Sequence, residues 1–135
     1  ANSMNKSTLL QIKNILEAGH SLTFTSESSG QGGEKVIVSL NDKPIGEVYT
    51  WDKEEKRHRN IVYGSDVEAK LAGEIKEWMY EAFFPYVAAR DIICDSYMCD
   101  FQIYEGVLTL GISGEWSYDG MEETEGGMMV LEGED

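Results

Sequence analysis

Apolar residues recur at helical spacing in two parts of the chain. The first part runs from about Ser7, a residue type that favours helix N-caps, to Ala18, and Gly19 marks its end. One stripe of this segment carries Leu9, Ile12 and Leu16. The spacing predicts a short amphipathic helix that covers a core with one face.

The second helical stretch, residues 65–90, is longer and more apolar. Ser65 and Glu68 have the spacing of a capping box. Pro85 should end or kink the helix near Phe84, and residues 85–90 should resume it. The apolar stripe of this stretch consists of Val67, Leu71, Ile75, Trp78, Met79 and Ala82. A helix with so apolar a face is expected to pack on a sheet.

Strand-like alternation of apolar and polar residues appears before and after the long helix. Residues 20–26 alternate, and residues 34–51 hold two further runs joined by Asn41 and Asp42, which tolerate the left-handed backbone of a tight turn. Residues 99–120 predict another hairpin around the turn at 104–106, with Gly111 and Gly114 as bulges or close backbone approaches.

The order of these elements is helix, three strands, long helix, two strands. It predicts an α+β fold, in which an antiparallel sheet of about five strands is packed by the long helix. We expect residues 1–3 to be the remnant of an expression tag and residues 4–119 to form a single domain. Residues 120–135 are either an acidic C-terminal tail or an edge strand.

Residues 52–60 (DKEEKRHRN) form the one concentrated basic segment. Two glutamates interrupt it, and it lacks the interleaved aromatic residues that are typical of nucleic-acid platforms. We therefore expect a solvated loop or hairpin tip. We expect no direct nucleic-acid binding, because a chain with a formal net charge of −14 is repelled by phosphates.

No catalytic, cofactor or metal motif stands out. The two cysteines, Cys94 and Cys99, lack the partners of a zinc site, and neither His20 nor His58 belongs to a nucleophile or metal motif. We expect no enzyme activity, no cofactor and no bound metal. No run of residues is apolar enough to span a membrane, which favours a cytoplasmic protein.

The negative charge is concentrated in the last third of the chain. Residues 1–90 contain 13 acidic and 11 basic residues, whereas residues 91–135 contain 12 acidic residues and no Lys or Arg. Folding does not require this segregation, because like charges repel within the folded chain. It either confers solubility alone or attracts a basic partner.

Under the second interpretation, one partner-binding surface combines acidic residues with two apolar anchors. The anchors would be Tyr118 and Met121, whose burial slows release, while the carboxylates accelerate encounter. The acidic members are Asp100, Glu105, Glu115, Asp119, Glu122, Glu123 and Glu125.

A small acidic protein with such a surface fits an inhibitor of a basic nucleic-acid-handling protein. An immunity protein against a nuclease toxin, or a phage or plasmid anti-defence protein, would have this role. Two alternatives stay open. One is an uncharacterised enzyme or small-molecule-binding domain with a carboxylate-lined cleft near Trp78 and Tyr86. The other is a module that forms oligomers through an exposed apolar face.

Overall fold

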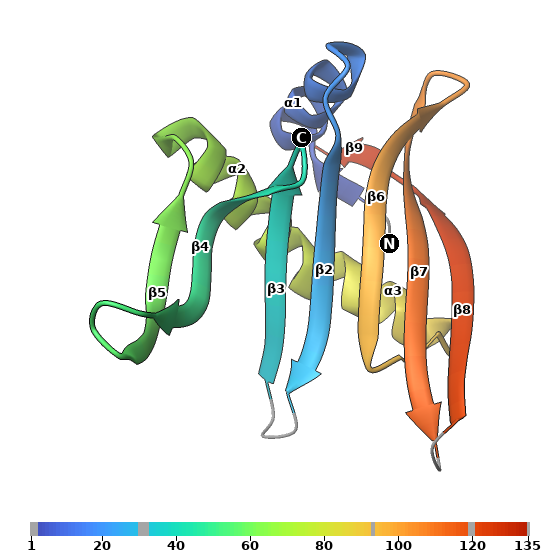
Figure 1. Cartoon of the computed structure of the whole chain (residues 1–135). Helices are drawn as coiled ribbons and strands as arrows, with labels where there is room; N and C mark the ends of the chain where they lie inside the picture. Colours follow the sequence, from blue (N-terminus) through green and yellow to red (C-terminus); the bar gives the residue numbers. More distant parts are fainter. Residues whose placement is uncertain (1–2, 30–32, 93, 119–120, 135) are drawn as a thin grey trace.

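Figure 1 shows the computed structural model of the chain, which describes residues 3–29, 33–92, 94–118 and 121–134. Seven strands, joined in antiparallel pairs, form one sheet in the order β5-β4-β3-β2-β6-β7-β8. The strands are β2 (Leu22–Ser29), β3 (Gly33–Leu40), β4 (Lys43–Asp52), β5 (Arg57–Tyr63), β6 (Ser96–Tyr104), β7 (Val107–Tyr118) and β8 (Met121–Val130).

The helices lie behind this sheet in Figure 1 and leave its front face uncovered. They are α1 (Lys6–Glu17), α2 (Asp66–Trp78) and α3 (Phe84–Ala89), and the π-helical turn η1 (Met79–Phe83) joins the last two. Two short strands, β1 (Ser3–Asn5) and β9 (Glu132–Glu134), pair in parallel and bring the two ends of the described chain together. The predicted α+β fold is confirmed, with seven strands in the sheet in place of about five.

The long helix begins where the sequence predicts, and its α-helical pattern is interrupted just before Phe84, at the π-helical turn of residues 79–83. The Ser65 backbone N–H donates to Glu68 Oε1 at 2.7 Å, and the Glu68 N–H donates to Ser65 Oγ at 3.2 Å, which completes the capping box. Pro85 lacks an N–H group and cannot donate to the preceding turn. The π-helical turn directly before α3 accommodates it, and the helix continues to Ala89. No helix in the described residues is long and apolar enough to cross a membrane.

The cap predicted for the first helix is wrong. Asn5, and not Ser7, caps α1: its Oδ1 accepts hydrogen bonds from the backbone N–H groups of Ser7 at 3.0 Å and Thr8 at 3.4 Å. The pairing of β1 with β9 extends to Asn5, so the helix begins at the next residue. Asparagine and serine are about equally good caps, and sequence alone does not separate them.

The core fills the space between the sheet and the helices. The rings of Phe24 on β2 and Phe83 on η1 meet edge to face with centroids 5.1 Å apart, and Phe101 on β6 lies 5.9 Å from Phe24. Leu108 and Leu110 of β7 are fully buried beside them. Because alternate residues of a strand point to opposite faces, the intervening residues of β6 and β7 lie on the uncovered face.

The tight turns have the backbone that the sequence predicts. Asn41 and Asp42 have φ of 50° and 65° between β3 and β4, and Glu105 and Gly106 have φ of 51° and 79° between β6 and β7. Gly114 marks a close approach: a Cβ added there would lie 2.5 Å from the Cys94 Sγ. Of the two alternatives for Gly114, close approach and bulge, the structure supports the first, since pairing of β6 and β7 is uninterrupted.

Candidate functional site

The uncovered face over β6, β7 and β8, named the β6–β8 face below, carries a group of exposed apolar side chains. Their exposed fractions range from 42% to 66%, so none of them belongs to the core. Strand register and alternation place all of them on the side away from the helices. The group consists of Met98, Tyr104, Val107, Met128 and Val130.

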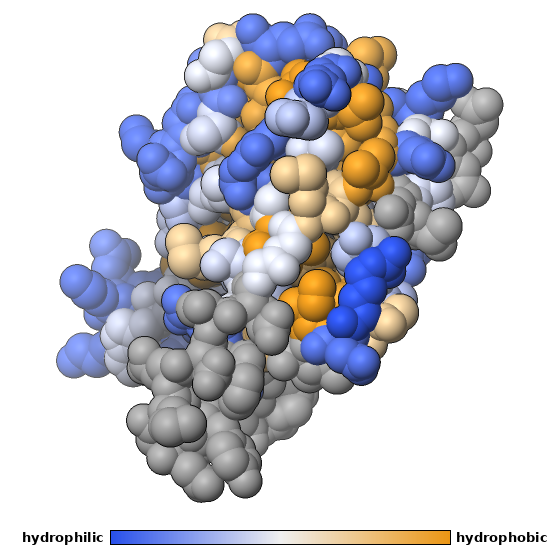
Figure 2. All heavy atoms as spheres, turned by 90° about the vertical axis from the view of Figure 1, so that its right-hand side faces the viewer, coloured by the Kyte–Doolittle hydropathy of each residue, from blue (hydrophilic) through white to orange (hydrophobic). Residues whose placement is uncertain are grey.

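Two glycines lie in the middle of the β6–β8 face. Gly111 pairs with Met128 across β7 and β8, and Gly126 pairs with Ser113. Ser113 and Asp100 separate Met98 from Met128 on this face. The Asp100 side chain covers Gly111, since a Cβ added at Gly111 would lie 2.7 Å from the Asp100 Oδ1. Figure 2, which views the molecule from the β8 side, shows hydrophobic atoms exposed among hydrophilic ones.

Two of the predicted acidic site residues lie on the same face. Asp100 pairs with Gly111, and its carboxylate accepts a hydrogen bond from Gln102 Nε2. Glu115 is exposed and pairs with Ser96 at the other end of the face. The ion pairs seen among the described residues join Arg57 and Arg59 to acidic residues of the β4–β5 hairpin. Within the same described residues, no Lys or Arg lies within 4.0 Å of the Asp100 or Glu115 carboxylate.

Four other predicted acidic residues have a described backbone. Glu105 occupies the β6–β7 turn, at the opposite end of β7 from Glu115. The register of β7 and β8 places the backbones of Glu122, Glu123 and Glu125 opposite residues 117, 116 and 114. The structure therefore brings these three positions close to Glu115 and leaves Glu105 apart. Outside the described part of the structure lie Asp119 and the side chains of Tyr118, Met121, Glu122, Glu123 and Glu125.

The described apolar members of the face were missed by the sequence reasoning. Met98 and Met128 are thirty residues apart in sequence and meet the same surface only because β7 pairs with both β6 and β8. A local signal existed for part of the group. Met98, Asp100 and Tyr104 occupy alternate positions of β6 opposite the buried residues, which is the pattern of a strand face without a cover.

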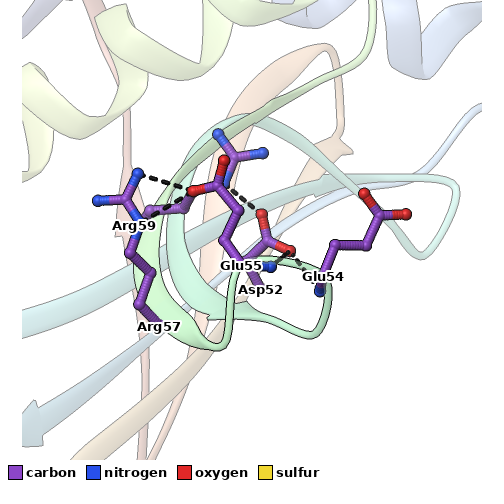
Figure 3. Close-up of polar contacts among 5 residues, drawn as sticks. All are labelled: Asp52, Glu54, Glu55, Arg57 and Arg59. Atoms are coloured by element: carbon purple, nitrogen blue, oxygen red, sulfur yellow. Dashed lines mark hydrogen bonds and ion pairs between the residues drawn. The ribbon is translucent and has the colours of Figure 1, made fainter.

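The basic segment at residues 52–60 forms part of a hairpin, with β5 beginning at Arg57. Figure 3 shows its ion pairs. Arg59 Nε donates to Asp52 Oδ2, and Arg57 Nη2 lies 2.7 Å from Glu55 Oε2. The hydrogen bond from Arg59 lowers the pKa of the Asp52 carboxyl, and backbone N–H donors add to this effect. Acidic residues of the same hairpin therefore pair with both arginines.

Aromatic residues do accompany this basic segment, contrary to the sequence interpretation. Trp51 and Tyr49 on β4 pair with His58 and Asn60 on β5. The His58 ring stacks on Tyr49 with centroids 5.6 Å apart and meets Trp51 edge to face at 5.2 Å. The interleaving arises across two strands, so the linear sequence of residues 52–60 does not contain it.

The alternative hypothesis places a carboxylate-lined cleft near Trp78 and Tyr86. Trp78 is buried in the core. Tyr86 borders a hollow of about 470 Å³ together with Glu81 and Glu132. The Arg90 guanidinium also lines this hollow and lies 3.6 Å from the Tyr86 ring centroid.

Comparison of the chain with protein-family models, with curated proteins and with solved structures finds no match.

Proposed function

We propose that this protein is a protein-binding module whose β6–β8 face docks on a basic protein. One observation carries the proposal. The face combines exposed apolar side chains, including Met98 and Met128, with the carboxylates of Asp100 and Glu115, which have no cationic partner in the described residues. Contiguous exposed apolar groups rimmed by polar ones are typical of interaction surfaces.

The two kinds of side chain would have different effects on binding. Carboxylates on a chain with a net charge of −14 attract a cationic partner over a distance and increase the association rate. Burial of the methionine side chains decreases the dissociation rate, and their flexible thioethers adapt to an irregular partner surface.

The partner class follows from charge. Proteins that handle nucleic acids carry basic surfaces that bind phosphates, and an acidic protein that covers such a surface competes with the nucleic acid. We therefore propose that the chain inhibits a basic nucleic-acid-handling protein, as an immunity protein or a phage or plasmid anti-defence protein does. In this role the chain itself performs no catalysis and holds no cofactor.

Affinity capture with matched variants tests this function. The wild-type protein is immobilised and exposed, at low salt, to lysate of the organism that carries the gene. The face variant is Met98→Gln with Met128→Gln. The control variant is Leu10→Gln with Val67→Gln, which changes two apolar residues that are equally exposed on the helices.

We expect the wild type and the control to retain the same basic protein and the face variant to lose it. Addition of the wild type at equimolar amount should then decrease the nucleic-acid binding or cleavage of the retained protein. Retention of the partner by the face variant would contradict the proposed surface. Undiminished activity of the partner would contradict the inhibitor role.

A further inference from the structure

The seven-stranded sheet is incompletely paired between β3 and β4. β3 pairs with β2 along residues 33–40 but with β4 only from Val38 to Leu40. Gly46 has φ of 79° and lies against the helix at Ala72, and from that residue β4 pairs with β5 alone in the described chain. The part of β3 before Val38 therefore presents one edge to which no described strand is added.

A groove of about 480 Å³ lies beside this edge. β3 contributes one wall, the β4–β5 hairpin a second, and α2 the floor. An extended chain in the groove would lie within reach of the backbone of β3. Strand addition of this kind is a recurrent mode of peptide recognition. The residues that line the groove include Val36, Glu47, Tyr49, Gly73, Lys76 and Tyr80.

Gly73 is the second observation that points to an occupant. It lies in the interior of α2, where glycine is less favourable than alanine. A Cβ added at Gly73 would meet no atom within 4 Å, so packing in the described structure does not require glycine there. The missing side chain keeps the floor of the groove open.

The lining residues indicate the chemistry of the occupant. The rings of Tyr49 and Tyr80 are exposed and line the groove, together with Val62. Lys76 is half-buried, and its Nζ donates to the Glu47 carbonyl oxygen. Burial lowers the pKa of Lys76, and the Glu47 charge opposes this effect only in part. A further carboxylate placed beside Lys76 would oppose it more fully. Lys35 supplies a second cation at the edge of β3.

We propose that this groove binds an extended peptide segment of a partner, which pairs with the free edge of β3. The segment carries a carboxylate beside Lys76 or Lys35 and apolar side chains against Tyr49 and Tyr80. This site lies on different strands from the β6–β8 face and has the opposite charge preference.

A synthetic peptide provides the probe. It is a fluorescein-labelled hexamer of alternating glutamate and valine, blocked at both ends, and a lysine–valine hexamer serves as its comparison. Fluorescence polarisation measures affinity, and amide hydrogen exchange locates the peptide. We expect saturable binding of the glutamate peptide, weaker binding of the lysine peptide, and slower exchange at backbone amides of residues 33–37.

Two variants of the groove test its role. Gly73→Leu fills the floor and should weaken binding about tenfold or more, whereas Gly73→Ala adds a single methyl group to the floor and should weaken binding by less. Lys76→Gln keeps a donor for the Glu47 carbonyl but removes the charge, so it should reduce the preference for glutamate over lysine. This second variant tests the proposal even if Gly73→Leu fails to fold.

Several results would overturn the proposal. One is that the Gly73→Leu and Gly73→Ala variants bind the peptide with equal affinity. Another is that the peptide slows amide exchange in β8 instead of β3. A third is that a short oligothymidine displaces the labelled peptide at a lower concentration than the unlabelled peptide does. The variant Met98→Gln with Met128→Gln should bind the peptide like the wild type. This variant therefore separates a failure of the proposed peptide site in the groove from a failure of the proposed partner-binding surface on the β6–β8 face.

Discussion

The indole Nε1–H of Trp78 donates a hydrogen bond to the backbone carbonyl oxygen of Ser3 at 3.1 Å. This contact joins the end of α2 to β1, a strand seventy-five residues earlier in the chain. β1 in turn pairs with β9, so one buried side chain holds together the middle and both ends of the described structure.

Trp78→Phe should therefore destabilise the fold. The substitution removes the donor, leaves the Ser3 carbonyl without this partner and opens space in the core, and we expect a loss of about 1–3 kcal/mol in unfolding free energy. Urea denaturation measures it. Trp51→Phe is the matched control, since Trp51 is half exposed, and it should change the free energy by less than about 0.5 kcal/mol. Equal losses in the two variants would show that the Trp78 contact contributes nothing specific.

Gly46→Ala should destabilise more than the same substitution at Gly106. Both glycines have φ of 79°, so each substitution places a side chain in the left-handed region, at about 1–2 kcal/mol. At Gly46 the new Cβ would also lie 2.5 Å from the Ala72 Cβ, whereas at Gly106 it meets nothing within 4 Å. Overpacking should add about 1–3 kcal/mol at Gly46 alone. Thermal unfolding of both variants checks the difference, and similar melting temperatures would contradict the close packing of β4 on α2.

The ion pair of Asp52 with Arg59 should make the β4–β5 hairpin sensitive to acid. The pKa of Asp52 is lower in the folded protein, chiefly through the hydrogen bond from Arg59. Its contribution to stability is therefore fully present above the unfolded pKa of about 3.9 and is lost as pH falls through the lower folded pKa. Asp52→Asn retains an acceptor for the N–H groups of Glu54 and Glu55 but removes the charge.

The comparison of wild type with Asp52→Asn, by chemical denaturation between neutral pH and strong acid, measures this effect. The wild type should be the more stable protein at neutral pH, and the difference should shrink as Asp52 becomes protonated. A difference that stays constant across the titration would mean that the Asp52 charge does not stabilise the hairpin.

Cys99 should be inert in the folded protein. Burial raises the pKa of its thiol, so the reactive thiolate is scarce at pH 8, and the side chain is also inaccessible. In a Cys94→Ser variant, alkylation followed by mass spectrometry should show no labelling in buffer and complete labelling in urea. Rapid labelling in buffer would indicate that β6 opens readily or that Cys99 is not in the core.

The fold class was readable from sequence because its main elements have strong local signals. The capping box at Ser65, the turn at Asn41 and Asp42, and the alternation along β6 each specify one local structure. β5 could not be predicted in this way. Its residues are exposed or half-buried and mostly polar, and it is a strand because β4 pairs with it over seven positions. No alternation of apolar residues indicates such a strand.

The candidate site was predictable only in part, for a related reason. The charge of residues 91–135 is visible in the sequence, and Asp100 and Glu115 do lie on one face. The apolar part of that face depends on strand order and register, which place Met128 of β8 two strands from Met98 of β6. Those relationships are tertiary, and neither the spacing nor the type of these residues reveals them.

The association rate constant of the captured basic protein, measured at increasing salt, tests the central claim most directly. The variants are Asp100→Asn with Glu115→Gln on the β6–β8 face, and Glu17→Gln with Glu77→Gln on exposed helical positions, with the same change of net charge. Between about 50 and 500 mM salt, the wild-type rate should fall roughly tenfold or more. At low salt the face variant should associate more slowly than the helix variant. Equal rates for the two variants, or a wild-type rate independent of salt, would contradict the proposal that carboxylates on this face select a basic partner.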